Sequence, residues 1–168
     1  MSGIREETRA AFEREKKRLR FKSSFDEIEE IFFLYDFFES EGFVSARFSR
    51  ALCRRITNLF WNWNSYLHNL IMPSPNSMVM ITESQMMDED RRVQILNLMN
   101  RIVAHAVRNS VIGLEPNDTQ EAKFIDESVQ VWKDAVQPGL SDIMKHVLRE
   151  WKGKADQPAK VERGPRHP

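Results

Sequence analysis

Residues 47–72, RFSRALCRRITNLFWNWNSYLHNLIM, predict the long helix around which the rest of the fold is arranged. The apolar side chains of this stretch recur every three or four positions, which places them on one face of a helix. They are Phe48, Leu52, Ile56, Leu59, Trp63, Leu67 and Leu70. The same stretch carries arginines, asparagines and a further tryptophan, which is more polar than a core helix requires. We expect one helix over 45–71, ended by Pro73 and Pro75.

Residues 3–21, before this helix, are highly charged. Their thin apolar line consists of Ile4, Ala11 and Leu19. A helix this polar usually lies on the surface, so residues 1–22 are interpreted as a solvated helical arm, with a partner-binding arm as the alternative.

A second helix is predicted over 24–40. Ser24 and Glu27 have the spacing of a capping box, and Gly42 ends the segment. Phenylalanine, isoleucine and leucine side chains surround much of this helix, so we expect it at the centre of the bundle or with one flank in a protein interface.

Residues 72–87, after the long helix, contain turn residues and a short β-prone run at 79–82. We expect this linker to cross the end of the bundle with its methionines filling gaps in the packing. A mobile functional loop is the alternative.

Three further helices are predicted, over 88–112, 118–136 and 141–151. The first is expected to be capped by Asp88 and stopped by Gly113, and the second to be ended by Pro138 and Gly139. The inner face predicted for the first consists of Val93, Leu96, Met99 or Asn100, Val103 and Val107; that of the second consists of Phe124, Ile125, Val129 and Trp132.

No segment shows the alternation of a sheet, so the fold class is all-α. We expect a single-domain bundle of about five to six helices over residues 23–152. Residues 153–168 have almost no apolar anchors, so they are predicted to form a disordered tail.

The composition is that of a soluble globular protein, with 168 residues, 41% hydrophobic and 30% charged. The 25 basic and 25 acidic side chains cancel, so the net charge gives no reason to expect nucleic acid or membrane as a partner. No apolar run approaches the roughly 20 residues that span a bilayer, and the first residues are too charged for a secretory signal. Together with the single Cys53, this predicts a cytoplasmic protein without membrane association.

No metal or catalytic signature is present. His68, His105, His146 and His167 have neither the HExxH nor the Glu-x-x-His spacing of helical metal sites, and one cysteine cannot form a thiolate zinc site. We therefore expect no cofactor and assign no catalytic residue. Asp36, within FFLYDFF, is interpreted as the partner of an arginine from the long helix in a buried or half-buried ion pair, with a general base as the less favoured alternative.

The arginines of the long helix are the candidate binding residues. Arg47, Arg50 and Arg54 lie along one edge of the helix, with Arg55 beside them, and guanidinium groups in such a row can hold phosphates. Trp61 and Trp63 can stack on unpaired bases, although tryptophans at this spacing are more often core or interface anchors. Pairing with the acidic helix at 24–40 is the main competitor for these arginines.

Two stretches resemble HEPN domains, which are small α-helical bundles. One contains Arg54-Arg55, Asn58-Leu59 and Ser65-Tyr66-Leu67-His68, and the other begins with Arg108-Asn109, which is similar to the start of the hallmark motif of that family. The resemblance extends from about Ser24 to Trp151 and implies an RNA-associated or partner-binding module. In active members a histidine follows the arginine after four to six residues, and here Gly113 stands where it would be expected. The resemblance therefore does not carry over the ribonuclease chemistry.

Two functions are predicted from these patterns. The first is a non-enzymatic interaction module that forms a homodimer or binds a protein partner through apolar and aromatic faces of the helices predicted over 24–40 and 45–71, with interface residues Phe33, Phe37, Trp61 and Trp63. The alternative is an RNA- or DNA-associated domain, HEPN-like or similar to the small helical subunits of CRISPR effector complexes. Its binding residues would be Arg47, Arg50, Arg54, Arg55, Arg101 and Arg108.

Overall fold

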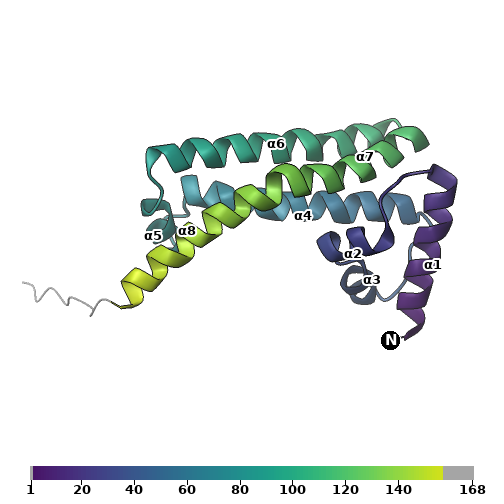
Figure 1. Ribbon diagram of the computed structural model, residues 1–168, viewed down its shortest axis with the longest axis horizontal. Helices are drawn as coiled ribbons and strands as arrows, with labels where there is room; N and C mark the ends of the chain where they lie inside the picture. The colour runs from purple at the N-terminus through teal and green to yellow at the C-terminus, as the bar shows by residue number, and fades with distance from the viewer. Residues whose placement is uncertain (1, 157–168) are drawn as a thin grey trace, which may run out of the picture.

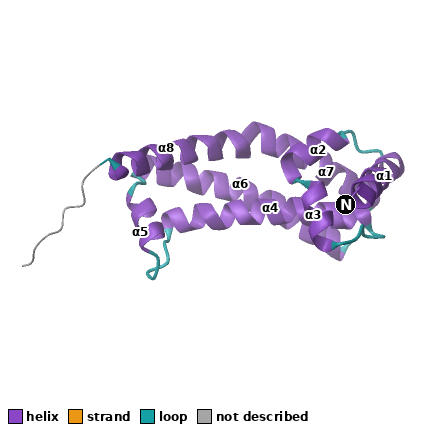
Figure 2. Ribbon diagram, turned by 90° about the horizontal axis from the view of Figure 1, so that it is seen from below, coloured by secondary structure: helices purple, strands orange, loops and turns teal. Residues whose placement is uncertain are grey.

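The computed structural model describes residues 2–156 and confirms the all-α, single-domain bundle; this part of the chain contains no strand. Four long helices lie lengthwise: α4 (Phe48–Ile71), α6 (Glu89–Leu114), α7 (Asp118–Val131) and α8 (Gln137–Ala155). Figure 1 shows α1 (Ser2–Leu19), α2 (Phe25–Phe32) and α3 (Leu34–Glu41) gathered at one end, with α5 (Met78–Gln85) at the other. Figure 2 shows that α4, α6 and α8 run side by side along the molecule.

The core is dominated by phenylalanine. Phe60 of α4 lies near its centre, within 6.4 Å of the ring centroids of Phe32, Trp132 and His105, which belong to three other elements. Ring pairs of this kind contribute to stability beyond the apolar area that they bury.

The helix predicted as a solvated arm, α1, is instead part of the bundle. Phe12 is fully buried, and its ring packs edge-on against Phe21, Phe25 and Phe48. Thr8, Ala11, Glu15 and Leu19 are buried as well. The arm interpretation was wrong because Phe12 adds a large apolar side chain to a stripe that otherwise looks too thin to pack.

The helix predicted over 24–40 is divided in two at Phe33. This residue has a left-handed backbone, with φ of 52°, and its N–H ends α2 by donating to the Glu29 carbonyl at 2.9 Å. The Glu29 carboxylate then accepts from the Tyr35 N–H at 3.0 Å, near the start of α3. In a straight helix, residues 32 and 34 would point about 200° apart. The turn lets Phe32 and Leu34 both be fully buried.

The linker crosses the end of the bundle, as expected, but forms α5 rather than an extended run. Arg92 anchors it by donating to the backbone carbonyls of Ser84 and Met87, at 2.8 and 3.2 Å. Met86 and Met87 pack against the core, whereas Met72 and Met78 are exposed. The methionines thus fill gaps only at the end of this segment.

The break predicted at Pro138 and Gly139 does not occur. The chain passes from α7 through a π-helical segment, η1 (Trp132–Val136), directly into α8. Pro138 falls in the first turn of α8, where its missing N–H is tolerated after the wider π turn. A Cβ at Gly139 would lie 3.0 Å from Leu98 Cδ2, so glycine allows α8 to approach α6 closely here.

The final helix extends to Ala155, so the predicted tail boundary at residue 153 is three residues too early. Residues 157–168, the rest of the predicted tail, lie outside the described residues.

The orientation predicted for α6 was also wrong. Asp88 caps the helix as expected, accepting from the Arg91 N–H at 2.9 Å, but the predicted inner residues Val93, Leu96 and Val107 are about half exposed. The face that packs inward consists of Ile95, Leu98, Ile102, His105, Ala106, Asn109 and Ile112.

Candidate functional site

The six candidate arginines do not form one continuous surface. Arg47, Arg50 and Arg54 line a common hollow of about 360 Å³ at the start of α4. Arg55 turns toward α2 and α3, where Nε donates to the Phe32 carbonyl at 2.6 Å and the guanidinium lies 5.7 Å from the Phe37 ring centroid. Burial lowers the pKa of Arg55, although Asp36 and Glu29 oppose that shift. Arg55 therefore has a structural role.

The two candidate arginines of α6 differ from each other. Arg108 forms an ion pair and a hydrogen bond with Glu127 of α7, and Arg101 is exposed without an ion pair to any residue in 2–156. The helical spacing places Arg101 two turns before Arg108, on the side of α6 that faces α7 and α8. Neither residue lines the hollow of Arg47, Arg50 and Arg54.

Arg50 links α4 to α7. Its Nη1 lies 3.5 Å from Oε1 of Glu121, a carboxylate only 4% exposed, and this Nη1 is buried without a hydrogen-bond partner. The acidic helix preceding α4 was the expected partner of the arginine edge, and the partner of Arg50 is instead a residue of α7. A buried carboxylate needs such a cation, since an unpaired charge in the interior is strongly unfavourable.

Asn109 of α6 completes the lining of the hollow and was not identified from the sequence as a site residue of its own. It is 9% exposed; its Nδ2 donates to the Cys53 carbonyl at 3.5 Å, and its Oδ1 is buried without a hydrogen-bond partner. No side chain caps the start of α4 beside it. We name this set the arginine hollow: Ser45, Arg47, Arg50, Ala51, Arg54 and Asn109.

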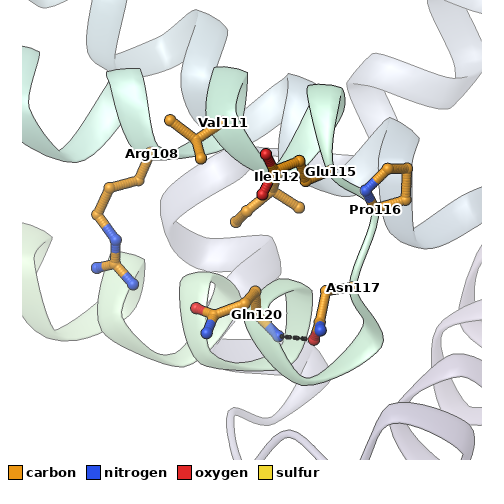
Figure 3. Close-up of a pocket in the computed structure, with 7 residues that line it drawn as sticks. All are labelled: Arg108, Val111, Ile112, Glu115, Pro116, Asn117 and Gln120. Carbon is orange, nitrogen blue, oxygen red and sulfur yellow. Dashed lines mark hydrogen bonds between the residues drawn. The ribbon is translucent and has the colours of Figure 1, made fainter.

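A second hollow, of about 560 Å³, lies where α6 passes into α7 (Figure 3). Arg108 extends along one side of it, while Asn117 and Gln120 lie at the start of α7. Two of its polar side chains have structural partners: Asn117 accepts from the Gln120 N–H at 3.0 Å, and Arg108 pairs with Glu127. The side chains of Glu115 and Gln120 are exposed, and no buried polar atom without a hydrogen-bond partner belongs to this lining.

Asp36 is exposed, so its predicted burial was wrong. It lies in the first turn of α3, where a carboxylate interacts favourably with the positive end of the helix dipole. The sequence FFLYDFF suggested an apolar environment, but the turn at Phe33 directs residue 36 outward.

The four predicted interface residues differ in exposure. Phe33 and Trp61 are 48% and 38% exposed. Phe37 packs against Phe38, and Trp63 packs edge-on against Tyr66, so both of these residues are only partly buried against the core. Trp61 and Trp63 belong to α4 and Phe37 to α3, and Phe33 forms the turn between α2 and α3.

A row of exposed apolar residues lies on α6. Its outward face presents Val93, Leu96, Val107, Val111 and Leu114, which are 46–83% exposed, with the half-buried Val103 and the exposed Asn97, Asn100 and Ala104 between them. We name this set the outer stripe of α6. It carries no charged residue, and Figure 1 shows α6 along one edge of the bundle, where this face is not covered by another helix. Exposed apolar stripes of this extent mark interaction sites.

His105 is a buried core histidine. Its Nε2 lies 2.7 Å from Ser128 Oγ, which in turn donates to the Phe124 carbonyl, and its ring stacks on Phe124 at 4.8 Å. Burial, assisted by the charge of Arg108, lowers its pKa to about 4. At neutral pH the ring is therefore uncharged and donates to Ser128.

Acid is expected to destabilise the fold through His105. The folded-state pKa lies below the ordinary value of 6.5, so the stabilisation is fully present above pH 6.5 and is lost as the pH falls toward about 4. The loss should reach about 2 kcal/mol after allowance for partial solvent screening. Urea unfolding of the wild type and of His105→Gln across this pH range measures it, and parallel pH profiles of the two proteins would contradict the assignment.

Comparison with known proteins gives no assignment. No family model matches the chain, and neither a curated protein nor a solved structure matches it significantly. Among residues 2–156, no group of three or more histidine, cysteine or acidic side chains is placed to hold a metal ion. In the same range no helix combines the length and the apolarity needed to cross a membrane.

Proposed function

We propose that this protein is a non-enzymatic interaction module that forms a homodimer through the outer stripe of α6. The observation that carries this proposal is the spacing of the stripe. Val93, Asn100, Val107 and Leu114 recur every seven residues, and Leu96 and Val103 occupy the intervening apolar positions. This is close to the heptad pattern of a two-helix coiled coil. The first position holds Val93, Asn100, Val107 and Leu114, and the second holds Leu96, Val103 and the polar Ser110.

The charges and composition of the stripe favour a second copy of this chain as its partner. The stripe carries no charge, so two copies in contact do not bring like charges together. A polar asparagine at one of the repeating positions pairs well with the same residue of an identical helix in parallel register. Asn100 has this position near the middle of the stripe, and Ala104 beside it allows the helices to approach closely.

The size of the stripe sets the expected strength of the dimer. Val93 to Leu114 spans about 32 Å of helix, and a width of about 10 Å gives a surface on the order of 300 Å². Stable complexes bury roughly 800 Å² per partner. We therefore expect a dimer that dissociates on dilution.

Replacing Val107 by glutamate is expected to raise the dimer dissociation constant at least tenfold, or by ~1.4 kcal/mol, because two carboxylates would face each other in an apolar contact. Sedimentation over a concentration series measures it. Leu148→Glu on α8 is the matched control, since Leu148 is 54% exposed and lies outside the stripe. A wild-type chain that stays monomeric at all concentrations, or equal effects of both substitutions, would refute the proposal.

The parallel register is tested by cysteine cross-linking. Cys53 is buried, and burial raises its thiol pKa to about 12, so it does not interfere. Asn100→Cys is expected to form a covalent dimer under oxidation. If Val93→Cys and Leu114→Cys instead cross-link only when mixed, the helices pair antiparallel.

A second candidate function, association with RNA or DNA as in HEPN-like domains, is favoured by Arg47, Arg54 and Arg101, which are exposed and form no ion pair within residues 2–156.

The proposed location is a reducing compartment such as the cytoplasm, since the cysteine is buried and unpaired.

A further inference from the structure

The arginine hollow has the features of a binding site for a small anion. Three arginines line it, and its acidic neighbours, Glu15, Asp118 and Glu121, lie in an adjoining hollow that Arg47 and Arg50 also line. Arginine can donate two parallel hydrogen bonds to a phosphate group, and the N–H groups at an uncapped helix start attract the same charge. The α4 start lacks a side-chain cap at this place. Its volume of about 360 Å³ lies within the range of small-molecule pockets.

Two buried atoms at the hollow lack hydrogen-bond partners, and they differ in kind. Arg50 Nη1 is a donor and Asn109 Oδ1 is an acceptor. Buried polar groups are nearly always hydrogen-bonded. Arg50 Nη1 has the Glu121 carboxylate as its ion-pair partner at 3.5 Å, so Asn109 Oδ1 is the atom that indicates a missing partner. Asn109 lines the hollow, and its Nδ2 donates to the Cys53 carbonyl at 3.5 Å, so Oδ1 is the amide atom that lacks a partner. A phosphate group could donate to Oδ1 only through a protonated oxygen, and neighbouring guanidinium groups favour the deprotonated form.

We propose that the arginine hollow binds a phosphorylated sugar or nucleotide, with the phosphate on Arg47, Arg50 and Arg54 and a ligand hydroxyl donating to Asn109 Oδ1. The ligand provides both the anion that three arginines attract and the hydroxyl donor that the asparagine requires. The hollow does not include the outer stripe of α6, so binding is independent of dimerisation.

Ribose 5-phosphate, inorganic phosphate and ribose are the probes, titrated calorimetrically against the full chain. We expect ribose 5-phosphate to bind most tightly, phosphate more weakly and ribose undetectably. The variant Arg47→Ala/Arg54→Ala should weaken both phosphate ligands at least ~10-fold, and it should fold, because neither residue forms an ion pair within residues 2–156. Lys145→Ala/Lys152→Ala removes two exposed cations of α8 and should leave the affinities unchanged.

Asn109→Ser tests the hydroxyl contact. We expect it to weaken ribose 5-phosphate about fivefold and to leave inorganic phosphate unchanged. Equal affinity of the wild type for the two phosphate ligands would overturn the role of Asn109. Unchanged binding by the double arginine variant, or no binding by the wild type, would overturn the site. If a single-stranded RNA binds far more tightly than ribose 5-phosphate and loses binding in the double variant, the ligand is a polymer and the small-molecule assignment is wrong.

The titrations are repeated with Val107→Glu to separate this site from the proposed dimer. Retained affinity in a monomeric variant supports an independent site, whereas loss of affinity together with the dimer would show that the hollow needs the second copy.

Discussion

Phe60→Ala is expected to lower the free energy of unfolding by about 3–5 kcal/mol. Phe60 is fully buried, and its ring is in contact range of rings from α2, α6 and η1. Its removal leaves a cavity among side chains that belong to four elements and cannot all move inward together. The lost free energy has two parts: the favourable transfer of the ring from water to the core, and the van der Waals contacts that the cavity walls made with the ring.

Chemical denaturation of this variant beside Phe43→Ala measures the effect. Phe43 is 58% exposed, so the same substitution there should change the free energy by less than ~0.5 kcal/mol. Similar losses for the two variants would show that the centre of the bundle is not at Phe60. If Phe60→Ala destabilises only α1 to α3 and leaves the unfolding of the long helices unchanged, Phe60 belongs to a separately unfolding part of the molecule and not to a single core.

The helical class and the position of α4 could be predicted because apolar spacing over a long segment is a strong signal. The inner face of α6 could not be predicted, because this helix has two apolar faces, each with residues at heptad spacing. Ile95 and Ile102 lie on one face, and Val93 and Val107 lie on the other. Periodicity shows that both exist, and only packing against α4 and α7 decides which is buried. The same ambiguity is the reason to expect a partner on the exposed face.

The turn at Phe33 could not be predicted from propensity, since phenylalanine rarely adopts a left-handed backbone. It is supported by hydrogen bonds of Glu29 and by the burial of residues on both sides. Burial raises the pKa of Glu29, while backbone N–H groups of Tyr35 and Leu34 oppose that shift. A carboxylate followed six residues later by a backbone donor has no distinctive sequence signal.

The arginine hollow could be predicted only in part. Arg47, Arg50 and Arg54 follow from helical spacing, whereas Asn109 and Glu121 come from helices far along the chain. Their placement depends on the antiparallel packing of α4 and α6, in which Asn109 lies opposite Cys53. The lack of a hydrogen-bond partner for Asn109 Oδ1 can be recognised only from the packed structure.

Arg50→Ala is expected to destabilise the protein by about 3–5 kcal/mol, because it leaves the Glu121 carboxylate buried without its cation. The side chain of Glu121 is only 6% exposed, and Arg50 lies 3.5 Å from it. Glu121 also borders, with Arg50, a hollow of about 540 Å³ from which water can partly replace the guanidinium, so we expect a loss at the lower end of this range. This is also the reason to test ligand binding with Arg47 and Arg54 rather than with Arg50.

A double-mutant cycle with Glu121→Gln separates charge from packing. Because glutamine keeps the shape of the side chain and removes its charge, we expect Arg50→Ala/Glu121→Gln to recover about 2 kcal/mol of the loss caused by Arg50→Ala alone. Arg54→Ala is the matched control, since Arg54 is exposed one turn further along α4 and should be close to neutral for stability. If the double variant is no more stable than Arg50→Ala, the contribution of Arg50 is the packing of its hydrocarbon chain, and the ion pair with Glu121 does not hold α7 to α4.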